Sequence, residues 1–257
     1  MGGRRWGDGH PHSEIPIRAG PRYKPGMDPG LYVVGTPIGN LADVTLRSLE
    51  VLGAVHVVLA EDTRHTRKLM TRHALCAPLL SCHRFSEATR LQSVLNRIRD
   101  GEAVALVTDS GMPGVSDPGA RIVAGCREAG LPVTVIPGPS AVTAAIALSG
   151  YPGEAFVFEG FLPVKPGGRS RRLEAVEAES RAVVIFESPH RLLKLLDELG
   201  RRMPSRRVFV GRELTKLFEE GTEGTPEEVR RHYESRSVKG ELVLVLAPLD
   251  RKRHRGN

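Results

Sequence analysis

The stretch LYVVGTPIGN, residues 31–40, decides the fold class, because a short apolar run passes at once into a loop of glycine, proline and threonine. The run is short enough for one buried strand, and the segment after it, from Thr45, has the apolar spacing of a helix. A strand, a tight loop and a helix in this order form the repeating unit of α/β folds. The sequence therefore predicts a mostly parallel sheet with a ligand loop at the carboxyl end of its first strand.

The same alternation of short apolar runs and amphipathic segments continues to residue 149. Its clearest helix begins after Ser86, a good N-cap, and stops before Gly101. The expected strands are Leu31–Gly35, Val55–Ala60, Pro78–Ser81, Ala103–Thr108 and Pro132–Ile136, and the expected helices are Thr45–Leu52, Thr63–Arg72, Ser86–Asp100, Gly119–Ala129 and Ser140–Ser149.

A turn-rich joint, YPGE at residues 151–154, precedes a second set of elements. Consecutive short strands near residues 207–220 predict a mixed, partly antiparallel sheet there. We expect strands at Phe156–Glu159, Ala182–Glu187, Arg207–Arg212, Leu217–Glu220 and Gly240–Leu246, a basic loop at Pro163–Arg172, and helices from there to about Ser180, at His190–Arg202 and at Pro226–Ser235.

A length of 257 residues also favours two domains over one. The expected division is a disordered N-terminal arm over residues 1–28, an α/β domain over 29–151, a second α/β domain over 152–248 and a basic tail over 249–257. Met27 stands directly before the first strand, so the true start could also be there.

The net charge and the length of the apolar runs limit the partners and the cellular location expected for this protein. A net charge of +7, with Arg outnumbering Lys, is compatible with nucleic acid as a partner, although Arg spread over a solvated surface explains the charge equally well. There is no run of 18 apolar residues and no signal-like core, so we expect a cytoplasmic protein without a membrane partner. The three cysteines lack the spacing of a zinc site, and no metal is expected.

Three loops rich in small residues follow expected strands and would meet at one end of the first sheet: GTPIGN at 35–40, TDSGMPGVSDPG at 108–119 and IPGPS at 136–140. The first has neither the glycine spacing of a dinucleotide site nor the Lys of a P-loop. Together they would suit a zwitterionic, adenine-bearing molecule, with room for a flat ring beside Ser110 and with Asp109 binding an ammonium or a sugar hydroxyl. Structural turns, with Ser140 as a helix N-cap, are the alternative.

A fourth segment, AEDTRHTRKL at residues 60–69, gathers charges of both signs at a strand-to-helix junction. One interpretation is substrate binding. The other is that Asp62 caps the following helix and Arg64 is its surface partner.

Seven segments resemble, in order, motifs of the ribosomal RNA methyltransferase I family within the tetrapyrrole-methylase-like superfamily. They are residues 31–40, 60–67, 109–119, 136–140, 158–163 (FEGFLP), 187–191 (ESPHR) and 211–216 (GRELTK), so the match spans about residues 30–247. The resemblance implies two α/β domains with S-adenosyl-L-methionine in the cleft between them, and a homodimer. It also implies 2'-O-methylation of a cytidine in the decoding region of 16S rRNA, presented as rRNA or as the small ribosomal subunit.

The resemblance also implies roles for residues in the matching motifs. The cofactor-binding residues would be Gly35, Thr36, Pro37, Asp109, Ser110, Gly111, Pro139, Ser140 and, from the second domain, Phe186. The substrate-side residues would be Asp62, Arg64, Arg191, Arg212 and Glu213.

A ribose hydroxyl is a poor nucleophile until its proton is removed, so a base is expected near the transferred methyl group. Glu61, Glu187 and His190 are the candidates, and the sequence does not rank them. The basic segment after FEGFLP predicts phosphate contacts through Arg169, Arg171 and Arg172, with a solvated loop as the alternative.

The sequence departs from the family pattern at two places, and two other functions remain as alternatives. Ser110 and Met112 stand where many relatives have Ala and Thr, and the basic run at residues 251–255 follows the last strand where many relatives continue into a helical tail. Docking on the subunit would then fall to that run or to the N-terminal arm. The other functions are methylation of a tetrapyrrole precursor and RNA binding without catalysis, and binding of S-adenosyl-L-methionine would argue against the second.

Overall fold

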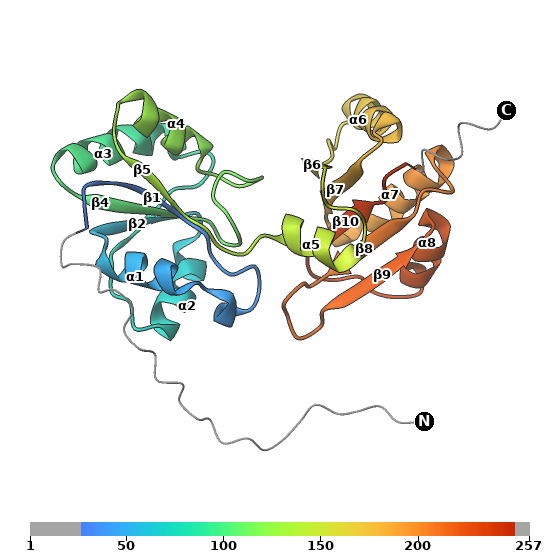
Figure 1. The fold of residues 1–257 in the computed structure, drawn as a ribbon, viewed down its shortest axis with the longest axis horizontal. Helices are drawn as coiled ribbons and strands as arrows, with labels where there is room; N and C mark the ends of the chain where they lie inside the picture. The colour runs from blue at the N-terminus through green and yellow to red at the C-terminus, as the bar shows by residue number, and fades with distance from the viewer. Residues whose placement is uncertain (1–26, 250–257) are drawn as a thin grey trace, which may run out of the picture.

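The computed structural model describes residues 27–249 and folds them into two sheets with their helices, one in each half of the chain (Figure 1). Most of the expected N-terminal arm (residues 1–28) and basic tail (residues 249–257) falls on residues 1–26 and 250–257, outside the described residues. Between residues 27 and 249, no helix combines the length and the apolar character needed to cross a bilayer.

The first sheet is parallel throughout and follows the predicted strands closely. It contains β1 (Gly30–Val34), β2 (Val57–Ala60), β3 (Leu79–Ser81), β4 (Ala103–Val107) and β5 (Val133–Ile136), in the order β3-β2-β4-β1-β5. All residues of β1, β2 and β4 are buried, as expected when helices cover both faces of a parallel sheet. The predicted α/β class is confirmed.

Two pairs of helices cover this sheet. α1 (Leu46–Ala54) and α2 (Thr63–Arg72) pack on one face through residues such as Leu52 and Leu69, and η1 (Leu41–Asp43) leads into α1. α3 (Glu87–Arg99) and α4 (Ala120–Glu128) pack on the other face through residues such as Ile98 and Ile122. Ser86 occupies the predicted N-cap position of α3, but its hydroxyl donates to His83 O and makes no capping hydrogen bond.

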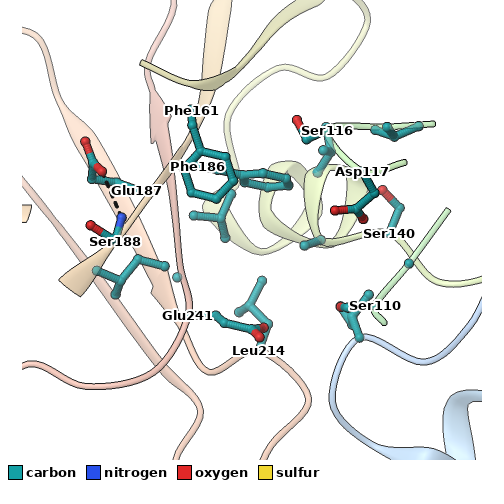
Figure 2. Close-up of a pocket in the computed structure, with 18 of the residues that line it drawn as sticks. Ser110, Ser116, Asp117, Ser140, Phe161, Phe186, Glu187, Ser188, Leu214 and Glu241 are labelled. Atoms are coloured by element: carbon teal, nitrogen blue, oxygen red, sulfur yellow. Dashed lines mark hydrogen bonds between the residues drawn. The ribbon is translucent and has the colours of Figure 1, made fainter. Parts of the chain in front are cut away.

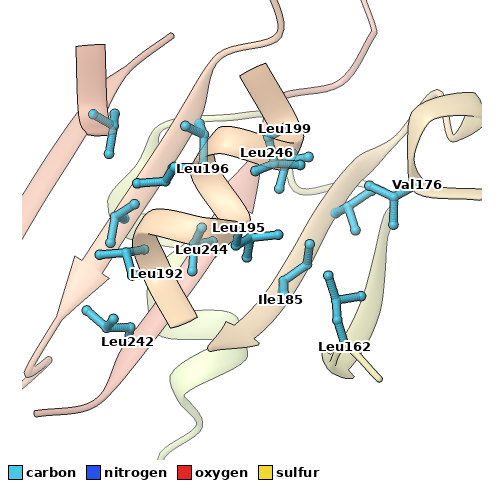
Figure 3. Close-up of a cluster of buried hydrophobic side chains, with 14 of the residues drawn as sticks. Leu162, Val176, Ile185, Leu192, Leu195, Leu196, Leu199, Leu242, Leu244 and Leu246 are labelled. Carbon is cyan, nitrogen blue, oxygen red and sulfur yellow. The ribbon is translucent and has the colours of Figure 1, made fainter. Parts of the chain in front are cut away.

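The second sheet is mixed, as predicted. It contains β6 (Phe156–Phe161), β7 (Ala182–Glu187), β8 (Val208–Arg212), β9 (Glu220–Gly224) and β10 (Leu242–Leu246), in the order β6-β7-β10-β8-β9. β6 and β7 are parallel, and the other pairs are antiparallel. α6 (Pro166–Ala178), α7 (Pro189–Arg202) and α8 (Pro226–Glu234) cover one face over a leucine-rich core (Figure 3).

The helix α5 (Ala141–Ser149) packs on the second sheet, although the sequence analysis placed it in the first domain. Its Val142, Ala145 and Ile146 form a buried cluster with residues of β7 and β10, among them Val184 and Val243. The chain therefore crosses between the sheets before α5, and the boundary expected at residues 151–152 falls after that crossing (Figure 1). The apolar residues of α5 cover the face of the second sheet that the other three helices leave open.

Two further expectations for the second half are wrong. Residues 166–172 are the start of α6 and not a loop, because Pro166 fits the first turn of a helix and Leu173 buries itself in the core. β9 begins at Glu220 and not at residue 217, because Glu213 and Thr215 have positive φ angles (50° and 68°) that form a turn after β8.

Candidate active site

A cavity of about 350 Å³ lies between the two halves of the chain, at the carboxyl end of the first sheet (Figure 2). Its volume is in the range of small-molecule sites. Loops after β1, β4 and β5 form one wall, with Ile38, Ser110, Gly111, Met112, Val115, Ser116, Asp117 and Ser140. α5 and the second sheet form the other, with Ala141, Val142, Phe161, Phe186, Glu187, Ser188, Pro189, Gly211, Leu214 and Gly240 to Val243.

The loops after β1 and β4 are joined by a pair of backbone hydrogen bonds. Thr36 N donates to Gly111 O at 2.9 Å, and Gly111 N donates to Thr36 O at 3.2 Å. The Thr36 hydroxyl also donates to Thr108 O at 3.1 Å, and Thr36 is only 5% exposed. Thr36 therefore holds the two loops together and does not itself line the cavity.

The loops after β1 and β5 touch through two glycines. A Cβ on Gly35 would lie 2.7 Å from Gly138 Cα, and a Cβ on Gly138 would lie 2.8 Å from Gly35 Cα. Real side chains do not tolerate such distances, so both positions require glycine. This contact fixes the loop that carries Pro139 and Ser140 beside the cavity.

The far end of the first loop reaches the second half of the chain. Asn40 N donates to the Thr215 hydroxyl at 3.1 Å, and a Cβ on Gly39 would meet Lys216 Cγ at 2.5 Å. The GTPIGN loop and the turn after β8 therefore join the two halves of the chain by a direct contact.

The predicted cofactor residues separate into two sets. Ser110, Gly111, Ser140 and Phe186 line the cavity. The others lie in the same loops without lining it: Gly35, Thr36, Pro37, Asp109 and Pro139. Ser140 occupies the N-cap position of α5, but its side chain makes no capping hydrogen bond, so its hydroxyl is available to a ligand.

Asp117 lines the cavity with its carboxylate directed inward (Figure 2). It forms no ion pair within residues 27–249. Partial burial, together with the negative charges of Glu61 and Asp109, raises the pKa of Asp117 to about 7, although Arg84 acts in the opposite direction. A carboxyl group in this state can exchange a proton near neutral pH.

Glu61, a predicted base, lies outside the lining of the cavity. Partial burial and the charge of Asp109 raise the pKa of its carboxyl group. Asp109 is itself fixed, because its carboxylate accepts a hydrogen bond from Asp62 N at 3.0 Å. These two acids therefore contribute negative charge near Asp117.

For Asp62 and Arg64 the structure shows the capping arrangement. The Asp62 carboxylate accepts from Arg64 N at 2.8 Å at the start of α2 and forms an ion pair of 2.6 Å with the Arg64 guanidinium. The side-chain hydrogen bond from Arg64 holds the pKa of Asp62 well below its usual range. The Arg64 side chain is 89% exposed.

Glu187 lines the cavity wall, but its side chain is fully buried in a network of charges. It accepts hydrogen bonds from Arg191 and from Ser188 N, and Arg169 Nη1 lies 3.4 Å from its Oε2. Arg169 also pairs with Glu198 at 2.7 Å, and its own side chain is 5% exposed. Arg169 therefore neutralises the buried Glu187 and the partly buried Glu198, and it is not accessible to a phosphate.

The remaining candidates for substrate binding, phosphate binding and proton transfer do not line the cavity. Arg212 pairs with Glu220 at 2.9 Å, and Glu213 pairs with Lys216 at 2.9 Å in the turn after β8. The other three are His190, exposed in the first turn of α7; Arg172, paired with Glu159; and Arg171, exposed in α6.

Several cavity residues escaped the sequence analysis, among them Asp117, Phe161, Leu214 and Glu241. The first three lie inside the motifs at residues 109–119, 158–163 and 211–216, but nothing in the sequence indicated that these particular residues would line the cavity. Phe161 packs edge to face on Phe186, with ring centroids 5.6 Å apart, and the two rings form an apolar wall. Over residues 27–249, no group of three or more His, Cys, Asp or Glu side chains is arranged to hold a metal ion.

Comparison with known sequences gives one consistent family. Residues 30–230 match the tetrapyrrole (corrin/porphyrin) methylases. The chain is 44% identical over 217 residues to the ribosomal RNA small subunit methyltransferase I of Thermotoga maritima, a match covering 84% of this chain and 97% of the relative. The protein of the same name from Escherichia coli O157:H7 is 43% identical over 227 residues, covering 84% and 77%.

Solved structures show the same fold at low identity. Uroporphyrin-III C-methyltransferase from Thermus thermophilus, complexed with S-adenyl homocysteine, matches with a TM-score of 0.59 at 22% identity, covering 85% of this chain and 97% of that one. A diphthine synthase matches with a TM-score of 0.64 at 15% identity, covering 84% and 89%.

Proposed function

The chain belongs to the ribosomal RNA small subunit methyltransferase I family of the tetrapyrrole methylases, and we propose on that basis that it methylates the ribose 2'-hydroxyl of a cytidine in the decoding region of 16S rRNA. It is a methyltransferase that uses S-adenosyl-L-methionine. The observation that carries the proposal is the cavity between the two sheets, which the loops of the family motifs build.

The cavity fits this cofactor in size and chemistry. Its volume of about 350 Å³ suits a molecule of that size, and apolar side chains such as Phe186 and Leu214 stand beside the hydroxyls of Ser110 and Ser140. Gly111, with a φ of 82°, keeps the backbone open to a ligand. We assign cofactor binding to Ser110, Gly111, Ser140 and Phe186.

When bound, the cofactor supplies a methyl group already activated on a positively charged sulfur. The residues of the chain then have three tasks: they align the acceptor oxygen with that methyl group, exclude water and accept the acceptor proton. The apolar wall of Phe161 and Phe186 contributes to the exclusion of water.

The partner is a polyanion in this proposal, either 16S rRNA or the assembled small subunit. The net charge of +7 supports it, because Arg and Lys that neutralise phosphates supply much of the affinity for RNA. The exposed Arg171 and the half-exposed Arg172 are the candidates for phosphate binding on α6. The proposal includes a homodimer, which the family resemblance implies, and the cytoplasmic location expected from the apolar pattern of the sequence.

The test is transfer of labelled methyl groups from S-adenosyl-L-methionine to purified small subunits that lack the modification, followed by nuclease mapping of the labelled nucleotide. We expect label in a 2'-O-methylcytidine of the decoding region, and none in subunits that already carry the modification. Cofactor binding without label in subunits or naked rRNA would refute the rRNA assignment and favour a tetrapyrrole precursor as acceptor.

A further inference from the structure

Three carboxylates line the cavity, and they differ in their partners. Glu187 is buried and paired with Arg169 and Arg191. Glu241 lies 3.2 Å from Lys216 Nζ, and its side chain is 70% exposed to solvent. Asp117 forms no ion pair within residues 27–249. Among the described residues, Asp117 is thus the carboxylate of these three that has no ion-pair partner.

The loop around Asp117 holds this carboxylate in place. Ser116 has a φ of 65° and Gly119 a φ of 128°, so the backbone turns sharply on either side of it. Gly114 N donates to Pro118 O at 3.0 Å, and Gly119 N donates to the buried Glu87 carboxylate at the start of α3. Figure 2 shows the Asp117 carboxylate directed into the cavity, which Ser140 also lines. These hydrogen bonds and the two sharp turns fix the loop that directs the Asp117 carboxylate into the cavity.

The charged groups that face Asp117 come from four segments. Glu61 follows β2, Asp109 follows β4 and Glu241 precedes β10, while Arg84 precedes α3. Three carboxylates and one guanidinium make the surroundings of Asp117 negative, and burial adds to the free-energy cost of ionising it. The resulting pKa of about 7 matches the requirement of a general base that must take and release a proton at neutral pH.

We infer that Asp117 is the catalytic base that takes the proton of the acceptor hydroxyl, an inference that rests on the proposed function. The O–H bond breaks and its proton passes to the Asp117 carboxylate. The acceptor oxygen keeps the electron pair and forms the bond to the methyl carbon, whose bond to sulfur breaks with its pair left on sulfur. Asp117 then releases the proton to water when the products leave.

The three bases named from the sequence are placed less favourably. Glu61 and His190 do not line the cavity, and Glu187 has its carboxylate occupied by two arginines and by Ser188 N. Glu61 instead acts on Asp117 by its charge.

The experiment measures single-turnover methyl transfer to unmodified small subunits, and S-adenosyl-L-methionine affinity, for the wild type, Asp117→Asn and Asp117→Glu. Asp117→Asn should lower the transfer rate about 10²- to 10⁴-fold while the cofactor still binds. Asp117→Glu should recover part of the rate, because it retains a carboxylate. Asp197→Asn, an equivalent change on the outer side of α7, should leave the rate unchanged.

A pH profile separates a base from a structural residue. The wild-type rate should rise up to about pH 7 and then level off, and Glu61→Gln should move this rise to lower pH because it removes a like charge beside Asp117. Carbon NMR of labelled aspartate provides a readout other than activity: one carboxyl should titrate near neutral pH, vanish in Asp117→Asn and move down in Glu61→Gln.

The possible failures are distinguishable. If the wild type transfers methyl groups and Asp117→Asn does so at the same rate, or if the Asp117 carboxyl titrates near pH 4, Asp117 is not the base and the proposed function stands. If the wild type binds the cofactor but labels no ribosomal RNA, the proposed function is refuted, and the role of Asp117 falls with it.

Discussion

Two strand-to-helix junctions line the same cavity, and each presents a carboxylate to it. The two carboxylates differ in the charges that surround them. The junction after β4 presents Asp117, which pairs with no cation from residues 27–249 and lies near the further acids Glu61 and Asp109. The junction after β7 presents Glu187, buried and neutralised by Arg169 and Arg191. A buried carboxylate with two arginines serves as a fixed wall, whereas one among like charges can exchange a proton. The first half of the chain thus supplies reactivity, and the second half supplies rigidity.

The largest expected effect follows from removing a cation from the junction at Glu187, so that its carboxylate, like that of Asp117, is less neutralised. Arg169→Met leaves Glu187 and Glu198 without one of their cations, and it should lower the free energy of unfolding by about 2–4 kcal/mol. The measurement is urea unfolding. The control is Arg201→Met, which removes an exposed pair with Asp197 and should change stability by less than about 0.5 kcal/mol. Equal effects of the two changes would show that the buried network does not stabilise the second half.

The next effect tests the rigid contact between the loops of the first half. Gly138→Ala places a Cβ 2.8 Å from Gly35 Cα, and we expect a loss of about 1–3 kcal/mol of stability together with weaker binding of S-adenosyl-L-methionine. Thermal unfolding and calorimetric titration measure the two quantities. Gly167→Ala is the control, because nothing lies within 4 Å of a Cβ there. Unchanged cofactor affinity in Gly138→Ala would mean that this contact does not shape the cavity.

A smaller effect concerns the stability cost of the unpaired acid. Asp117 titrates at about 7 in the folded chain and at about 3.9 when unfolded, so its contribution is absent at low pH and destabilises increasingly as the pH rises from about 4 to 7. Asp117→Asn should therefore raise stability at pH 8 by roughly 1–2 kcal/mol after allowance for solvent screening, and by far less at pH 4.5. Urea unfolding at both pH values measures this, and the same gain at both would contradict it.

The smallest effect concerns RNA affinity on the outside of the second half. Arg171→Ala with Arg172→Ala should flatten the dependence of log K on log salt by about 0.7 for each phosphate of single-stranded RNA that the variant no longer neutralises. Filter binding at several salt concentrations measures the slope. A double change of equal charge, Arg201→Ala with Arg231→Ala, is the control. If the two double variants gave the same salt dependence, Arg171 and Arg172 would not bind phosphates and α6 would be an ordinary solvated helix.

Local patterns in the sequence predicted much of the fold and the position of the site. The strands of the first sheet follow from short apolar runs bounded by Gly and Pro, which are properties of neighbouring residues. The same holds for the loops after β1, β4 and β5, and parallel strands bring their carboxyl ends to one edge. Three of the loop residues that the family resemblance assigns to the cofactor do line the cavity, namely Ser110, Gly111 and Ser140.

The partners of charged side chains depend instead on residues far away in the chain. Arg169 belongs to a basic segment whose composition predicts phosphate binding. In the structure it pairs instead with Glu187 and Glu198, which lie 18 and 29 residues further along the chain. α5 has an apolar surface that suits either sheet, and only the packing of β7 and β10 decides that it covers the second. In the same way, Asp117 is one of many acids in the sequence. Only the folded chain buries part of its carboxyl group and places Glu61 and Asp109 nearby, because burial and Coulomb interactions depend on distances in space and not on positions along the chain.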